Sequence, residues 1–183
     1  KRWSLQILSS LLKKGKLNTI IFLNYEPKLQ KFLSWNQQLM AESLGKKTKG
    51  FLPFISSVPK DHHSLLQLYL DGPKDKLFYI FSSANDYKIK IKSKIMGKEL
   101  DFLDKKKLSK IKKAQKNALI KIFKQKKIPF REFSIKNINE KTLGELFSYF
   151  ILETAILGKI SKINPFDQPA VDQVKIRTKQ NLI

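Results

Sequence analysis

The chain has 183 residues, a net charge of +22, 42% hydrophobic residues and no cysteine. This length suits one domain, or one domain with a remnant of another, and the hydrophobic content supports a real core rather than disorder. The absence of cysteine excludes disulfides and thiolate metal sites and fits a cytoplasmic protein. No run approaches the roughly 20 apolar residues of a membrane span.

Almost all of the positive charge comes from lysine, because arginine stands only at positions 2, 131 and 177. A strongly basic chain normally indicates nucleic acid or an anionic membrane as its partner. Bidentate recognition of bases and phosphates favours arginine, however, and the lysines are spread over the whole chain. We therefore expect a solvated lysine surface that helps to steer an anionic, phosphorylated substrate, with no nucleic-acid or membrane partner.

The first part of the chain alternates predicted helices and strands. Residues 3–12 have the apolar pattern of a helix end. Residues 17–25 form a short continuous apolar run that predicts a buried parallel strand. Pro27 then predicts a helix that continues to Leu44, with Gly45 as a C-cap candidate.

The alternation continues through residues 50–83. Residues 50–57 predict a second strand, although Pro53 weakens that prediction. Asp61 can cap a helix over residues 62–70, which Asp71-Gly72-Pro73 would close. The remaining predicted elements are a strand over 76–83, a lysine-rich edge hairpin strand within 84–100, helices over 101–127, 140–161 and 169–180, and a strand over 128–135. This order predicts an α/β fold with a parallel sheet flanked by helices and a C-terminal helical segment.

Three stretches carry candidate chemistry. In WNQQLMAESLGK, residues 35–46, Glu42 stands beside apolar neighbours near a helix end. Partial desolvation there suits a group that both takes and gives a proton. An ordinary solvated Glu is the alternative reading of that position.

The second stretch, KDHHSLLQLYLDGP, places two histidines at a predicted helix start. The helix dipole there favours a neutral imidazole that can relay a proton, and a structural or metal-binding pair is the alternative. In the third stretch, FDQPAVDQVK, Gln168 and Lys175 stand seven residues apart and share one helix face. A helix start with an amide and an ammonium suits a phosphosugar, although composition alone favours an ordinary amphipathic helix.

These three stretches, in this order, resemble the glucose-6-phosphate isomerase family, specifically the compact bacterial type, from about residue 17 to the end. The resemblance implies a sugar-isomerase (SIS) domain over 17–161, followed by an active-site loop and helix over 162–183, with residues 1–16 as a remnant of a preceding region. It implies that Glu42 is the catalytic base and His63 the ring-opening residue. It further implies that Lys175 assists at the ring oxygen, that Gln168 lies beside the substrate, and that no cofactor or metal is required.

The family's first domain, with its Gly-Gly-Arg stretch and most phosphate-binding residues, has no counterpart in this sequence, so we expect a C-terminal piece without a complete active site. Asp172 and Ser161 also depart from the family pattern. A ligand gathers at the carboxyl ends of parallel strands, where His63 fits but Glu42 does not. The resemblance resolves this by a homodimer in which His63 is donated across the interface to a phosphorylated hexose site. The alternatives are a non-catalytic SIS-type phosphosugar-binding domain and a basic nucleic-acid-binding module.

Overall fold

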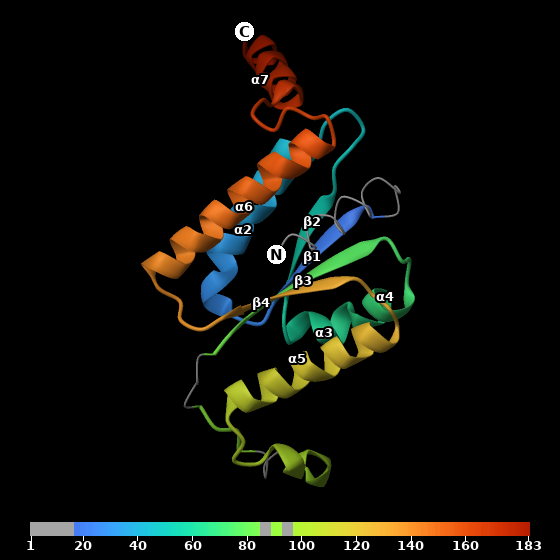
Figure 1. The fold of residues 1–183 in the computed structure, drawn as a ribbon, viewed down its shortest axis with the longest axis vertical. Helices are drawn as coiled ribbons and strands as arrows, with labels where there is room; N and C mark the ends of the chain where they lie inside the picture. The colour runs from blue at the N-terminus through green and yellow to red at the C-terminus, as the bar shows by residue number, and fades with distance from the viewer. Residues whose placement is uncertain (1–16, 85–88, 93–96) are drawn as a thin grey trace.

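A computed structural model describes residues 17–84, 89–92 and 97–183 of the chain. Four parallel strands form one sheet in the order β2-β1-β3-β4 (Figure 1). The strands are β1 (Thr19–Asn24), β2 (Leu52–Ser57), β3 (Lys76–Ser83) and β4 (Phe130–Ile135). The predicted α/β class, with a parallel sheet flanked by helices, is confirmed.

Helices connect the strands and cover both faces of the sheet, with α2 and α6 on one face and α3, α4 and α5 on the other (Figure 1). The predicted helices at 27–44 and 140–161 are confirmed. The helical elements are η1 (Pro27–Leu29), α2 (Gln30–Leu44), α3 (Lys60–Ser64), α4 (Leu66–Asp71), η3 (Lys98–Leu103), α5 (Leu108–Gln125), α6 (Glu140–Ile160) and α7 (Pro169–Leu182).

The central strands β1 and β3 are buried on both faces, as their continuous apolar sequences predict. Alternate side chains of these strands point to opposite faces. On one face, Phe22 and Phe81 pack with Phe32 of α2 and Phe150 of α6. On the other face the core contains Ile21, Leu23, Phe78, Ile80, Tyr69, Leu119 and Phe123. Burying each such side chain contributes about 1.5–3 kcal/mol, which fixes the helices against the sheet.

A buried ion pair joins β4 to α6. Arg131 donates to both carboxylate oxygens of Glu153 at 2.8 Å, and Tyr79 donates to the same carboxylate at 2.8 Å. The guanidinium also lies over the Tyr79 ring, 4.7 Å from its centroid. Arg131 is therefore used inside the fold and is not exposed for binding an external anion.

Pro53 is accommodated because β2 is an edge strand of the sheet. The backbone N–H groups of Leu52 and Val58 donate to Asn18 and Asn24, so even-numbered residues of β2 turn their backbone polar groups toward β1. Pro53 consequently faces the free edge, where it has no N–H to leave unpaired. Its carbonyl oxygen accepts a hydrogen bond from the Gln37 amide at 2.8 Å.

The predicted helix over 62–70 is interrupted at Leu65 and forms the two short helices α3 and α4. Asp61 does not cap it: α3 follows Pro59, and the Asp61 carboxylate instead accepts from the backbone N–H of Ser57 at 2.7 Å. The cap prediction was wrong because Asp61 lies within α3 and finds a donor at the end of the preceding strand.

Two further boundaries differ from prediction. The described residues of the 84–100 stretch contain no named strand, only an isolated antiparallel bridge between Lys90 and Lys107. The helix predicted over 101–127 begins at Leu108, after the short 3-10 helix η3. The helix predicted at residues 3–12, and with it the remnant assigned to residues 1–16, lies outside the described residues.

Candidate active site

The structure brings Glu42 and Gln168 into direct contact, although they stand 126 residues apart in sequence. The Gln168 amide nitrogen donates to one carboxylate oxygen of Glu42 at 2.8 Å, and the Gln38 amide nitrogen donates to the other at 3.0 Å. Glu42 lies in the last turn of α2, and Gln168 is the residue that precedes α7. Two amides therefore hold both oxygens of a half-buried carboxylate in one orientation.

Lys46, just beyond the end of α2, holds the loop that carries Gln168. Its ammonium donates to the Asp167 carboxylate at 2.8 Å and to the Asn164 carbonyl at 2.7 Å. The hydrogen bond from Lys46 lowers the pKa of the Asp167 carboxyl. Lys49 supports the same loop through the carbonyl of Ser161 at 2.8 Å. Sequence reasoning missed these lysines because nothing in their local pattern separates them from the many solvated ones.

Gly158 lets this loop pass close to α6. A Cβ at that position would lie 3.1 Å from Cβ and 3.2 Å from Cγ of Pro165. The absence of a side chain there allows the turn after α6 to fold back against the helix. The loop then continues to Gln168 beside Glu42.

Lys175 is placed apart from this contact. It lies on α7, a helix with no buried residue, and its ammonium is 3.5 Å from the Asp172 carboxylate. Both side chains are more than 60% exposed, at 70% and 64%. Figure 1 shows α7 extending beyond the α/β body, so the structure joins Glu42 with Gln168 and leaves Lys175 in solvent.

His63 lies at the other end of the sheet from Glu42. It belongs to α3, which follows the carboxyl end of β2, whereas Glu42 lies at the far end of α2, near the C-terminal end of α6 (Figure 1). The His63 side chain is exposed. The neighbouring His62 is half-buried, and its Nε2 lies 3.0 Å from the Tyr25 hydroxyl. Burial lowers the pKa of His62, so of the two histidines it is His62 that is packed into the fold.

This arrangement has the parts of a proton-transfer site around Glu42. The carboxylate is oriented by two amides and remains partly open to solvent, so it can exchange a proton with a bound molecule. Within the part of the chain that the structure describes, no helix is long and apolar enough to cross a membrane.

Comparison with known proteins agrees with the resemblance seen in the three sequence stretches. No protein-family model matches the chain. The chain is 35% identical over 166 residues to the glucose-6-phosphate isomerase of Mycoplasmopsis synoviae, covering 89% of this chain and 39% of that protein. It is 34% identical over 169 residues to the glucose-6-phosphate isomerase of Methanocaldococcus jannaschii, covering 89% of this chain and 40% of that protein.

Solved structures have the same fold. A hypothetical protein of Thermus thermophilus superposes with a TM-score of 0.81 at 27% identity, over 96% of this chain and 44% of that one. The glucose-6-phosphate isomerase of Chlamydia trachomatis superposes with a TM-score of 0.68 at 18% identity, over 92% of this chain and 35% of its own. The chain is therefore similar in sequence to glucose-6-phosphate isomerases, and it spans about two fifths of the length of the curated relatives it matches.

Proposed function

We propose that the chain supplies part of an aldose–ketose isomerase that interconverts glucose 6-phosphate and fructose 6-phosphate. The observation that carries the proposal is the 2.8 Å contact between Glu42 and Gln168. It unites two of the three stretches that resemble the isomerase family, at positions 126 residues apart in the sequence. The identity of 34–35% to relatives named glucose-6-phosphate isomerase supports the same reaction.

In this proposal Glu42 moves one proton between two carbon atoms of the open-chain sugar. The carboxylate takes the proton from carbon 2 of the aldose and leaves a cis-enediolate. Once the hydroxyl proton has moved from oxygen 2 to oxygen 1, the carboxylic acid returns its proton to carbon 1, which gives the ketose and restores the carboxylate. Proton and charge balance within the site, so no cofactor is needed. The Gln38 and Gln168 amides hold the carboxylate at the sugar, because each donates to one of its oxygens.

The remaining roles belong to Lys175 and His63. Lys175 attends the ring oxygen, and its position on an exposed helix leaves it available to a site completed by further protein. His63 opens the ring in the site of a second subunit of a homodimer. The placement of Glu42 and His63 at opposite ends of one sheet supports donation of the histidine across a two-fold axis.

The test replaces Glu42 by Gln in a full-length chimera, in which this chain substitutes for the matching part of the Mycoplasmopsis synoviae relative. A positioned acid–base group contributes about 10²–10⁴-fold, so kcat should fall at least about a hundredfold while substrate affinity changes little. The matched control is Glu145→Gln, which removes the same charge from an exposed position on α6. A coupled assay of fructose 6-phosphate conversion gives both constants.

The rival reading is a domain that binds a phosphosugar without transforming it. Exchange of the carbon 2 hydrogen with deuterium oxide separates the two readings, because only a proton-transfer site incorporates deuterium. A chimera that turns over at the unmodified rate with Gln at position 42 would contradict the role of that residue.

A further inference from the structure

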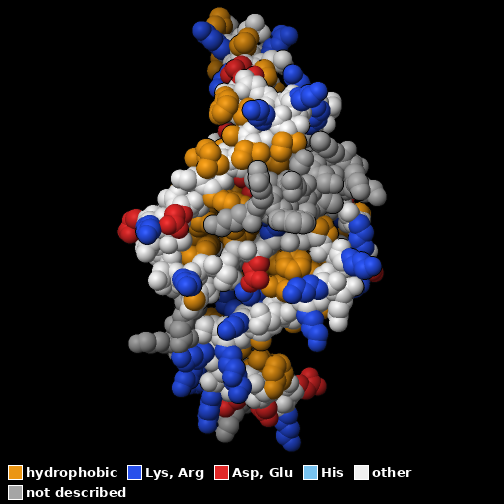
Figure 2. All heavy atoms as spheres, viewed as in Figure 1, with side chains coloured by type: hydrophobic (Ala, Val, Ile, Leu, Met, Phe, Trp, Pro, Cys, Tyr) orange, Lys and Arg blue, Asp and Glu red, His pale blue; other side chains and the backbone are white. Residues whose placement is uncertain are grey.

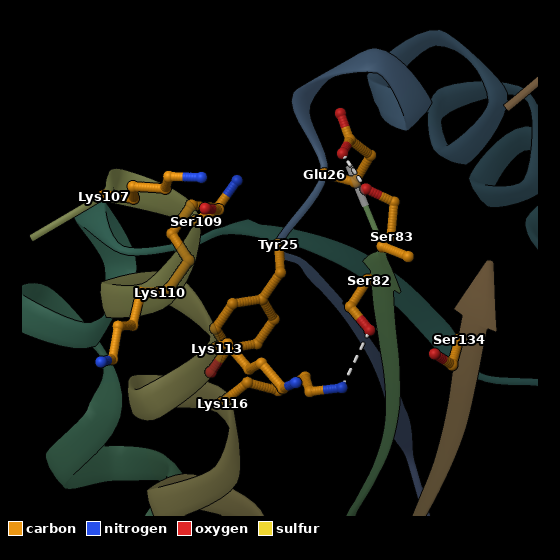
Figure 3. Close-up of a pocket in the computed structure, with 12 residues that line it drawn as sticks. Tyr25, Glu26, Ser82, Ser83, Lys107, Ser109, Lys110, Lys113, Lys116 and Ser134 are labelled. Atoms are coloured by element: carbon orange, nitrogen blue, oxygen red, sulfur yellow. Dashed lines mark hydrogen bonds between the residues drawn. The ribbon is translucent and has the colours of Figure 1, made fainter. Parts of the chain in front are cut away.

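A pocket of about 480 Å³ lies at the carboxyl ends of the strands (Figure 3). Glu42, in the last turn of α2, lies at the other end of the sheet (Figure 1). The floor of the pocket comes from the ends of β1 and β3, and α5 and the segment before it form one wall. The lining residues are Tyr25, Glu26, Ser82, Ser83, Ala84, Lys107, Ser109, Lys110, Lys112, Lys113, Lys116 and Ser134.

The pocket occupies the switch point of the sheet. From β1 the chain moves to β2 on one side, and β3 then pairs with β1 on the other side. The segments that leave β1 and β3 therefore diverge and leave a crevice above the strand ends. Open α/β sheets place ligands in such crevices, and a volume near 500 Å³ lies within the range of small-molecule sites.

The lining is strongly positive. Five lysines and one carboxylate, that of Glu26, line the pocket. The Glu26 carboxylate accepts from the backbone N–H of Lys28 at 3.1 Å and from the Ser83 hydroxyl. Lys116 is fixed in place, since its ammonium donates to the Ser82 hydroxyl at 3.1 Å and to Glu132 at 2.5 Å. Figure 3 shows Lys113 and Lys116 extending from α5 toward β3, whereas Lys110 extends away from it. On the molecular surface, Lys and Arg side chains gather over the same lower part of the molecule (Figure 2).

Hydroxyl groups supply the directional part of the lining. Ser82, Ser83, Ser109 and Ser134 come from two strands and a helix and meet at one pocket. Burial lowers the pKa of Lys112 on the same wall, while the charge of Glu26 opposes that shift. An ammonium that has lost part of its hydration gains from an anion placed nearby. The Ser82 hydroxyl accepts from Lys116 and can donate its own proton to the same anion.

We propose that this pocket binds a small phosphorylated metabolite, with its phosphate held by the α5 lysines and the serine hydroxyls. The pocket is separate from the carboxylate proposed as the isomerase base, because the pocket and Glu42 lie at opposite ends of the sheet. A recessed site of this volume fits a phosphate monoester of a small sugar better than a polymer. Nucleic-acid recognition usually relies on arginine, and Arg131 is held by Glu153 inside the fold.

The first test follows amide resonances of the full chain by NMR while inorganic phosphate or ribose 5-phosphate is added, with ribose as the uncharged comparison. We expect saturable shifts at Ser82, Ser83 and Ser109 with both phosphates and none with ribose. Stronger binding of ribose 5-phosphate than of inorganic phosphate would identify an organic phosphate as the preferred ligand. Shifts spread evenly over all lysine-bearing surfaces would overturn the proposal.

The second test compares two double variants of α5 by calorimetry with ribose 5-phosphate. Lys113→Gln with Lys116→Gln removes two pocket charges, and Lys121→Gln with Lys124→Gln removes two exposed charges at the same spacing outside the pocket. Each lost charge-assisted hydrogen bond weakens binding, so Kd should rise at least about tenfold for the first pair and less than about twofold for the second.

Equal weakening in both double variants would show a diffuse electrostatic effect and would refute a defined site. Circular dichroism checks that both variants fold, and the NMR titration of the unmodified chain decides the question if the first does not. Tight binding of a single-stranded RNA oligonucleotide without binding of either phosphate would assign the surface to nucleic acid instead. Loss of isomerase activity in the Glu42→Gln chimera leaves these outcomes unchanged, so the two proposals fail separately.

Discussion

Neighbouring residues of the same type receive different roles from the packing around them. His62 is half-buried against Tyr25, whereas His63, the next residue, is exposed. Burial raises the pKa of the Tyr25 hydroxyl, which therefore keeps its proton and can donate it to a neutral imidazole. Sequence alone indicated two histidines at a helix start, and the structure separates a structural one from one that is free to serve a partner.

The low pKa of His62 predicts a pH-dependent stability. The ordinary histidine pKa is 6.5, and burial lowers it in the folded chain, with the charge of Asp61 opposing. As the pH falls below about 6.5, the unfolded state therefore binds more protons than the folded state. The stability that neutral His62 contributes is present above about pH 6.5 and is lost as the pH falls toward the lower folded-state pKa.

Urea unfolding at pH 7.5 and 5.5 measures this effect. We expect the free energy of unfolding to fall less between these pH values in His62→Gln than in the unmodified chain. The adjacent His63→Gln serves as the control and should keep the original pH dependence. If the free energy of unfolding changed equally with pH in His62→Gln and in the unmodified chain, the imidazole would not titrate as its burial implies.

At the scale of elements, the site depends on the position of the loop that connects α6 to α7. Lys46 and Lys49 hold the connecting loop, and Gly158 gives it space beside α6. A glycine inside a helix normally costs about 0.5–1 kcal/mol relative to alanine. Its presence at the buried position 158 is explained by the contact with Pro165 rather than by the helix.

Two glycine substitutions on α6 separate these effects. Gly144→Ala meets no atom within 4 Å and should stabilise the chain by about 0.5–1 kcal/mol. Gly158→Ala places a Cβ 3.1 Å from Pro165, so this gain should be offset as the loop is displaced. Thermal unfolding measures the difference, and the side-chain amide resonance of Gln168 should shift in Gly158→Ala alone. An equal gain in stability for both variants would contradict the proposed role of position 158.

Sequence periodicity predicted the elements that a buried sheet determines. The apolar runs at 17–25 and 76–83 correspond to β1 and β3. A strand that is buried on both faces needs apolar residues at successive positions, so a continuous apolar run predicts it. The local pattern failed where a tertiary contact decides, as at Asp61, whose carboxylate accepts from the backbone N–H of Ser57 instead of capping a helix. The lysines of α5 were read as a solvated face, since composition alone cannot show that the helix wall faces a crevice.

On the scale of the whole molecule, the two ends of the sheet have different chemistry. Glu42 and Gln168 lie near one end, and the lysine pocket and α3 lie at the other (Figure 1). An isomerase site that uses both Glu42 and His63 therefore needs two chains. The proposed two-fold dimer makes this arrangement testable by mixing variants.

We predict complementation between chimeras that carry Glu42→Gln and His63→Gln. Each variant alone should have very low activity, because every site in its dimer lacks one residue. After the subunits are mixed and exchanged, half of the dimers are hybrids with one intact site, so about a quarter of the original activity should return. A coupled assay follows the recovery, and the absence of any recovery after demonstrated subunit exchange would place both residues in the same chain's site.

The free edge of β2 is protected against edge-to-edge aggregation between copies of this chain. Exposed backbone donors and acceptors along an edge strand can recruit further strands and lead to fibril growth. Here Pro53 offers no donor and its carbonyl is occupied by Gln37, while the outward N–H of Ser57 is held by Asp61. Although Leu52 and Phe54 expose apolar side chains on this strand, the edge lacks the continuous ladder that intermolecular cross-β pairing requires.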